Sequence, residues 1–285
     1  MPDKMKTALK QSRIVQTRQT KRWEMSVTAA KKKYAKICYT KTYLKDVILR
    51  VDFAAPVGNL VKKRLPGKLT KAALSRFPVA ESQKITAQEL QFSASGSLSS
   101  NSREETQWTF HGNEREKNIV IAPQFLVMRH SAYKSYEELA DDFFCVFGTL
   151  AEIESDLVIS RIGLRYINVI SIDDGNPLDW NEYIADSLLG IINSAHKKQN
   201  LSRSFHVLEY AFENINLKCQ FGIANPDYPA AIRRRQFVID MDAYSVTSHD
   251  TGTLRDVIDE SHEFIQDFFE SAITSETRKL MKSKK

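Results

Sequence analysis

The sequence is poor in cysteine and has neither a long apolar run nor an apolar leader. Its cysteines, Cys38, Cys145 and Cys219, lie far apart and form no C-x-x-C pair. A disulfide framework and a structural zinc site are therefore not expected, and a reducing cytoplasm is the expected compartment. No stretch approaches the roughly 18 apolar residues that a membrane helix needs, and the residues after Met1 form no secretory signal. We expect no membrane partner.

The common catalytic signatures are missing as well. The sequence contains no G-x-S-x-G, no P-loop and no G-x-G-x-x-G, and its six histidines show no H-E-x-x-H spacing. We predict no metal and no cofactor, and we favour a protein that is not an enzyme. His262 lies on the flank of an apolar helical pattern, which favours a packed, hydrogen-bonded histidine over a ligand. Cys145 and Cys219 fall inside apolar patterns and are expected to be inert.

What the sequence does have is a strong charge asymmetry. Residues 1–45 carry 13 Lys and Arg against two acids, and residues 278–285 carry five basic residues and no acid. Because the whole chain of 285 residues has a net charge of only +6, the body between these ends is acidic. The basic ends either fold back on the body or bind an anionic partner. Met25 is an alternative start of the protein.

Hydrophobic patterning predicts the secondary structure. Alternating or β-branched residues indicate strands at 47–53, 158–172, 205–212, 215–223 and 237–243, and a hairpin of 108–110 with 118–128. Apolar residues at steps of three and four indicate a helix that starts at Ser135 and another over 252–273, with a third at roughly 180–195. Residues 57–85 are expected as loop and short helix, and the polar segment 93–106 as a mobile loop.

This order predicts an α+β fold, with antiparallel sheets covered by long amphipathic helices. Each half contains strands, a hairpin and a long helix with a Phe-Phe pair, so we predict a pseudo-duplicated body with its break near 173–179. The expected parts are a basic arm (1–40), a first half (41–175), a second half (176–277) and a basic tail (278–285). The predicted core includes Phe143, Phe147, Phe221, Ile239 and Phe269.

One octapeptide is distinctive. The run Arg161-Ile-Gly-Leu-Arg-Tyr-Ile-Asn168 resembles the most characteristic stretch of a sporadically distributed, uncharacterised prokaryotic protein family of similar length. The strand 47–53, Trp108, Tyr136 and the closing segment 268–274 are also similar to that family, so the resemblance covers roughly 40–280. It implies no activity. A sporadic distribution is typical of accessory genes, such as those for phage defence or toxin control.

The same octapeptide supplies the candidate anion site. Arg161 and Arg165 share one strand face with Gly163 between them, and two guanidinium groups beside a glycine suit a phosphate or carboxylate. The alternative, which we favour, is an ion pair with carboxylates of another segment. Asp240 and Asp242 also share a strand face. Paired carboxylates can bind Mg²⁺, but with no third ligand nearby in sequence, salt bridging is favoured.

Basic clusters supply candidate nucleic-acid contacts. They are Lys21, Arg22, Lys31, Lys32, Lys33, Arg233, Arg234 and Arg235. Only Trp23 and Tyr34 are interleaved with the basic residues of the arm, so any contact would be to phosphates and without sequence preference. A charged strand edge that discourages pairing is the alternative for 233–235.

Three functions remain open. The first is a non-enzymatic binding or adaptor protein whose partner is another protein, and the missing catalytic motifs favour it. The second is a nucleic-acid-associated protein that uses the basic arm. The third is an enzyme with an unrecognised site near Arg161 and Arg165.

Overall fold

The computed structural model describes residues 39–61, 64–92 and 98–282, and the basic arm lies outside this part. Its strands are β1 (Leu44–Phe53), β2 (Val79–Phe92), β3 (Leu98–His111), β4 (Lys117–Ile121), β5 (Phe125–His130), β6 (Ile159–Ser171), β7 (Ser204–Ala211), β8 (Asn216–Ile223) and β9 (Gln236–Ser245). Its helices are α2 (Gly58–Val61), α3 (Gly67–Arg76), α4 (Tyr136–Ile153), α5 (Asp186–Ser194), α6 (Leu254–Ala272) and α7 (Ser275–Met281), with a 3-10 turn at Lys198–Asn200.

The strands form one antiparallel sheet, so the expected α+β class is confirmed. The nine strands follow the order β2-β3-β4-β5-β1-β6-β9-β8-β7. β1 and β6 lie at the centre and pair with each other, with Leu49 opposite Leu164. β6 also pairs with β9 along most of its length. The sheet is therefore continuous across the break that the sequence suggested at 173–179.

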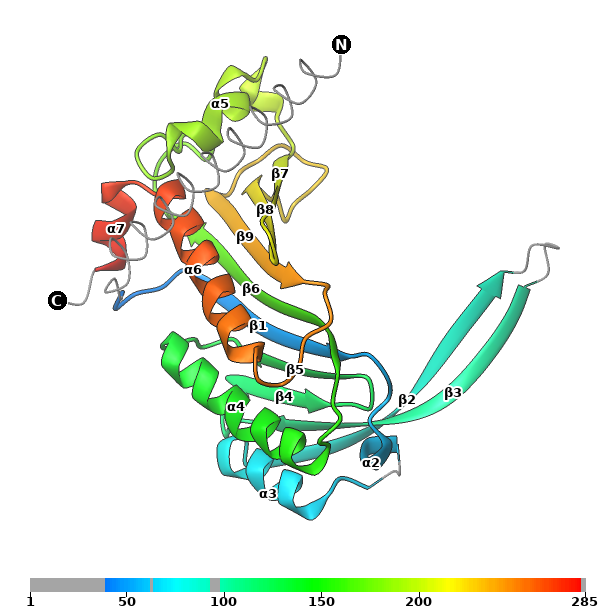
Figure 1. Ribbon diagram of the computed structural model, residues 1–285. Helices are drawn as coiled ribbons and strands as arrows, with labels where there is room; N and C mark the ends of the chain where they lie inside the picture. Colours follow the sequence, from blue (N-terminus) through cyan, green and yellow to red (C-terminus); the bar gives the residue numbers. More distant parts are fainter. Residues whose placement is uncertain (1–38, 62–63, 93–97, 283–285) are drawn as a thin grey trace, which may run out of the picture.

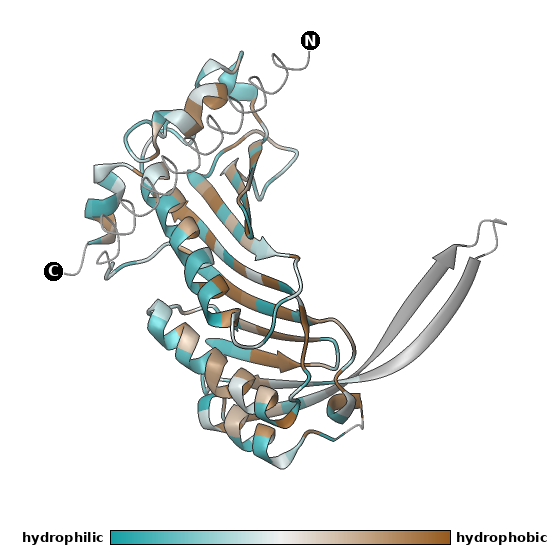
Figure 2. Cartoon of the chain, viewed as in Figure 1, coloured by the Kyte–Doolittle hydropathy of each residue, from teal (hydrophilic) through white to brown (hydrophobic). Residues whose placement is uncertain are grey.

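Helices α4 and α6 cross the same face of the sheet, and α3 packs beside α4 (Figure 1). The helix α4 begins at the predicted residue because the side chain of Ser135 accepts a hydrogen bond from the Glu138 amide at 3.2 Å. The negative charges of Glu137 and Glu138 in its first turn interact favourably with the positive end of the helix dipole. Hydrophobic residues run along the central strands behind the two helices (Figure 2). None of the helices in the described ranges is long and apolar enough to cross a bilayer.

The ribbon of β2 and β3 corrects two expectations. Residues 79–85 were expected in a loop and 98–106 in a mobile loop, yet both lie in strands that pair without interruption from Val79–His111 to Phe92–Leu98. The ribbon extends beyond the rest of the sheet (Figure 1). Away from the body its residues are mostly polar, so its sequence shows no buried-strand pattern. Only 93–97 of the expected loop lie outside the described residues.

The C-terminal end of the chain belongs partly to the fold. Residues 275–281 form α7, where Thr274 accepts a hydrogen bond from the Thr277 amide as N-cap. Arg278, counted with the basic tail, donates through Nε to Glu270 of α6 at 2.9 Å. The sequence missed this helix because its seven residues offer only two buried positions.

Four of the five predicted core residues are buried. Phe143, Phe147, Phe221 and Ile239 are at most 5% exposed, whereas Phe269 is only half-buried. The correction for Phe269 has a physical reason. This side chain lines a cavity and does not pack entirely against the sheet.

We predict that Phe221→Ala lowers the free energy of unfolding by about 3–5 kcal/mol, because it removes a ring from a closed core. Phe269→Ala should cost clearly less, since its ring is already partly exposed. Urea denaturation of both variants measures the difference. A loss below about 1 kcal/mol for Phe221→Ala would show that the buried face of β8 is misassigned.

Candidate functional site

The octapeptide 161–168 lies in β6 and presents two different faces. Ile162, Leu164, Tyr166 and Asn168 are buried on the face that the helices cover. Arg161, Gly163 and Arg165 lie on the opposite face, because side chains alternate along a strand. The two faces therefore carry different chemistry.

On the face away from the helices, the arginines are held by carboxylates. Arg165 donates two hydrogen bonds to Asp240 of β9, from Nε at 2.8 Å and from a terminal nitrogen at 2.6 Å. Arg161 lies between Asp52 of β1 and Asp242 of β9, at 3.8 Å from each. The expected contact with a carboxylate from another segment is confirmed for both arginines. The bidentate bond to Asp240 raises the pKa of Arg165, whereas burial raises the pKa of Asp242 above its usual value.

The glycine between the arginines has a structural role. A Cβ atom at Gly163 would lie 2.8 Å from a terminal nitrogen of Arg161, so the guanidinium folds back over the glycine. The same guanidinium lies over the ring of Tyr244, 5.4 Å from its centre. The space that the sequence suggested for an anion is thus occupied by the side chain of Arg161. This arrangement supports ion pairing and not an anion site.

The second basic cluster is also engaged in local contacts. Arg235 donates to the backbone oxygens of Asp174 and Asp179 and lies over the rings of Trp180 and Tyr183. Arg234 pairs with Asp227 at 3.1 Å, and Arg233 is exposed. The other candidate nucleic-acid contacts, Lys21, Arg22, Lys31, Lys32 and Lys33, lie outside the described residues. Arg234 and Arg235 are therefore engaged in local contacts, while Arg233 and Arg234 remain exposed.

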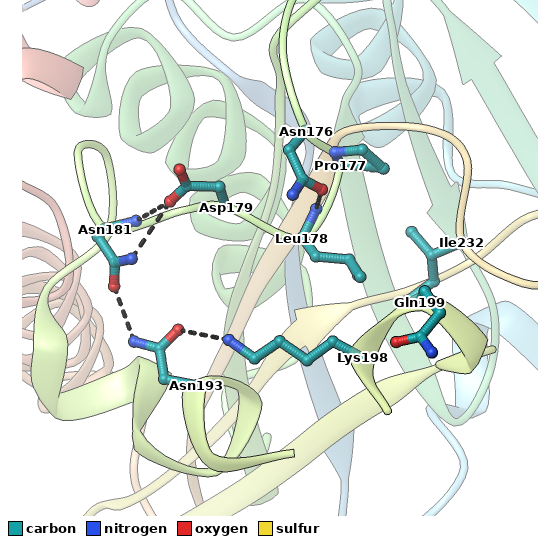
Figure 3. Close-up of a pocket in the computed structure, with 9 residues that line it drawn as sticks. All are labelled: Asn176, Pro177, Leu178, Asp179, Asn181, Asn193, Lys198, Gln199 and Ile232. Atoms are coloured by element: carbon teal, nitrogen blue, oxygen red, sulfur yellow. Dashed lines mark hydrogen bonds between the residues drawn. The ribbon is translucent and has the colours of Figure 1, made fainter. Parts of the chain in front are cut away.

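A polar pocket of about 580 Å³ lies beside the segment that follows β6 (Figure 3). Its side chains form a chain of hydrogen bonds from Asp179 through Asn181 and Asn193 to Lys198. These groups bond to one another and connect the loop at 176–181 to α5 and the 3-10 turn. These hydrogen bonds fix the loop, α5 and the 3-10 turn relative to one another.

A group of aromatic and titratable side chains lies on the covered face, between α4 and α6. A cavity of about 400 Å³ lies there above β6 and β9, and it extends to the start of β1 and to α7. Its volume falls in the range of small-molecule sites. Tyr166 and Asn168 of β6 and Met241 of β9 lie at its floor, and its walls come from the two helices. Its aromatic residues are Tyr39, Tyr133, Tyr136, Tyr166, His262 and Phe269.

A hydrogen-bonded chain links three of these rings. The hydroxyl groups of Tyr133 and Tyr166 are 3.0 Å apart, and the Tyr166 hydroxyl lies 3.1 Å from Nδ1 of His262. The ring of Tyr136 stacks on His262 with centres 4.0 Å apart and planes 1° apart. The Tyr136 hydroxyl donates to Asp259 one turn before His262. The expected packed, hydrogen-bonded histidine is confirmed.

Burial keeps the side chains of His262, Tyr166 and Tyr136 uncharged. Desolvation lowers the pKa of His262 to about 4, although Glu137 and Asp259 act in the opposite direction. Burial also raises the pKa of Tyr166 and Tyr136 well above their usual value. The imidazole and both phenols are therefore neutral at pH 7.

At the other end of the cavity, the charge of a buried carboxylate is balanced by an arginine. Glu270 is 2% exposed, accepts a hydrogen bond from the Tyr39 hydroxyl at 2.8 Å and pairs with Arg278 at 2.9 Å. Burial, together with this bond to Glu270, raises the pKa of Tyr39. These contacts hold the start of the described chain against α6 and α7.

Sequence reasoning missed this cavity because it treated the covered face as core. The available signal was alternation: Tyr166 and Asn168 occupy inward positions of β6 where Ile162 and Leu164 are apolar. Two polar groups at successive inward positions are unusual for a purely apolar core. His262 could be joined to them only in three dimensions, since it is 96 residues from Tyr166.

A second buried polar cluster has a structural explanation. Asp142 of α4 is 2% exposed and accepts a hydrogen bond from Lys117 at 2.6 Å, with the ring of His130 nearby. It connects α4 to β4 and β5. Within the described ranges, no group of three His, Cys, Asp or Glu residues is placed to hold a metal ion.

Comparison with known proteins adds no family to this geometry. No protein-family model matches the chain, and no curated protein matches it.

We predict that Gly163→Ala lowers the free energy of unfolding by up to about 1 kcal/mol, because the new Cβ displaces Arg161 from Asp52 and Asp242. Gly148→Ala in α4 is the control, since nothing lies within 4 Å of a Cβ there. It should stabilise the protein by about 0.5–1 kcal/mol through helix propensity. Urea denaturation compares the two, and a stabilising Gly163→Ala would contradict this account.

We predict that His262 makes stability depend on pH in acid. Its pKa is about 4 in the folded protein and 6.5 in the unfolded chain, so the unfolded state binds a proton first. Stability is full above pH 6.5 and is lost as the pH falls toward 4, by about 3 kcal/mol. Unfolding measured from pH 7.5 to 4, with His262→Gln as reference, isolates this contribution. Parallel curves for the two proteins would refute it.

Proposed function

We propose that this chain is a non-enzymatic binding protein whose ligand occupies the cavity between α4 and α6. The observation that carries the proposal is the pair Tyr166 and Asn168, which places a hydroxyl and an amide on the floor of a cavity lined by apolar, aromatic and polar side chains. Small-molecule sites combine apolar walls with a few such polar groups. Burying a polar group costs stability unless it is hydrogen-bonded, and Tyr166 and Asn168 are held in the cavity by such bonds.

The chemistry of the cavity favours binding over catalysis. Its histidine is neutral and hydrogen-bonded to Tyr166, and its buried carboxylate Glu270 is paired with Arg278. A general base needs a pKa near the working pH, and His262 at about 4 is far below it. Cys219 is buried, and burial raises the pKa of its thiol to about 12. These properties support a binding protein over an enzyme.

We also infer that the body arose by internal duplication. The first unit runs β1, short helices, β2 to β5 and α4, and the second runs β6, α5, β7 to β9 and α6. Each unit begins at the sheet centre, adds antiparallel strands from its own edge and ends in the helix that crosses the sheet. The boundary then falls between α4 and β6. The cavity lies between the two closing helices, as a shared site between repeats would.

The remaining expectations stay proposals. The free thiols of Cys145 and Cys219 support a reducing cytoplasm. We propose a protein partner and, from the resemblance of 161–168, a role in defence or toxin control. Nucleic-acid binding is supported only by the positive charge of the basic arm, because Arg234 and Arg235 make contacts within the fold.

We predict that a side chain placed at the mouth blocks binding. Thr42 is exposed at the cavity rim, so Thr42→Trp should weaken by about tenfold or more any fragment bound inside. Ser155→Trp adds the same side chain at an exposed turn away from the cavity and should leave binding unchanged. Saturation-transfer NMR with a fragment set measures both variants. A wild-type protein that binds no fragment, or binding that survives Thr42→Trp, would reject the cavity as the site.

A further inference from the structure

Among the described residues that line the cavity, the charged ones are Lys134 and Glu137, which are exposed, and Glu270, which is already paired. Tyr166, His262 and Asn168 face it as neutral groups, and Glu270 already shares its carboxylate with Arg278 and Tyr39. Bringing a charged ligand next to these groups would leave its charge without a counterion in a partly dry site. That desolvation is costly unless the charge is paired.

The charges nearest the cavity belong to its rim. Lys134 is 74% exposed on its side chain and lies 3.5 Å from Glu138, and Glu137 is in the first turn of α4. Asp259 is bonded to the hydroxyl of Tyr136 and does not line the cavity. These groups are of mixed sign and partly in water, so they favour neither anions nor cations inside.

The walls favour a flat molecule. Tyr136 and His262 are stacked face to face, and Tyr133 meets Tyr166 edge to face with centres 5.5 Å apart. Phe269 is half-buried on the wall that α6 provides. Aromatic walls gain most from another ring, which can pack by stacking or by edge contacts.

The floor favours an edge that both donates and accepts hydrogen bonds. The chain from Tyr133 through Tyr166 to His262 can point its protons in either direction, because a hydroxyl both donates and accepts. Asn168 adds an amide, whose Nδ2 donates one hydrogen bond to the backbone oxygen of Ile239 at 3.4 Å and carries a second hydrogen, while its carbonyl oxygen is an acceptor. An amide-like group on the ligand also both donates and accepts, so it matches the hydrogen-bonded chain and Asn168.

On the basis of the proposed function, we infer that the cavity takes an uncharged planar ring whose edge carries an amide-like group. Free nucleobases and aromatic amides share this chemistry. The inference rests on the arrangement of Tyr166, Asn168, His262 and the neutralised Glu270.

The test uses three molecules of nearly the same shape: benzamide, benzoate and benzamidine, which are neutral, anionic and cationic at pH 7.5. Ligand-observed NMR titrations on the full chain should give benzamide an affinity about tenfold or more above the other two. Adenine serves as the nucleobase arm, and its binding relative to benzamide separates the two sources. Tighter binding of benzoate or benzamidine would overturn the inference while leaving the cavity as a binding site. No binding by any of these molecules, while other fragments of the set still bind in the cavity, would also overturn the inference; a cavity that binds no fragment at all would overturn the proposed function itself.

Tyr166→Phe keeps the ring and removes the hydroxyl, so it should weaken benzamide by about threefold to tenfold. Toluene, which has no polar edge, should bind this variant as well as the wild type, and that result also shows that the cavity is intact. Tyr244→Phe on the opposite face is the matched control. Equal benzamide affinity for the wild type and Tyr166→Phe would overturn the role of the floor hydroxyl.

Discussion

The pairing of β6 with β1 on one side and β9 on the other is the constraint on which the described structure depends. A strand hydrogen-bonded on both sides has its register fixed, so each side chain of 161–168 has one face and no alternative. A slip by one residue would place Arg161 and Arg165 under the helices and move Tyr166 and Asn168 to the opposite face. Ion pairs on one side and the cavity on the other therefore enforce the same register.

The two faces stabilise the protein in different ways. Under the helices, apolar residues such as Leu164 and Ile239 are completely buried and supply the main driving force. On the other face, Arg165 and Asp240 satisfy each other where a partly buried carboxylate would otherwise be costly. The cavity interrupts the apolar face at Tyr166 and Asn168. A purely structural core would gain stability from apolar residues there, and this is the physical reason to connect the interruption with binding.

The fold class, most strands and both long helices could be predicted from the sequence because their patterns are strong. The alternation in β8 and the N-cap at Ser135 are local signals that fix elements directly. The ribbon β2–β3 was predicted only at 108–110, because the sequence at 98–106 is mostly polar and shows no apolar alternation. The ion pairs of Arg161 and Arg165 were predictable in kind, whereas Asp52 as a partner required the pairing of β1 with β6. The cavity depends on His262 meeting Tyr166 across 96 residues, which only the tertiary fold decides.

We propose that the covered face of β6 binds a ligand and that the ion-paired face does not. Chemical-shift mapping of the full chain with benzamide tests this claim directly. The account predicts that the largest shifts occur at Tyr166, Asn168 and His262, together with the first turn of α4. Shifts centred on Arg161, Arg165 and Asp242, with the cavity residues unchanged, would contradict it.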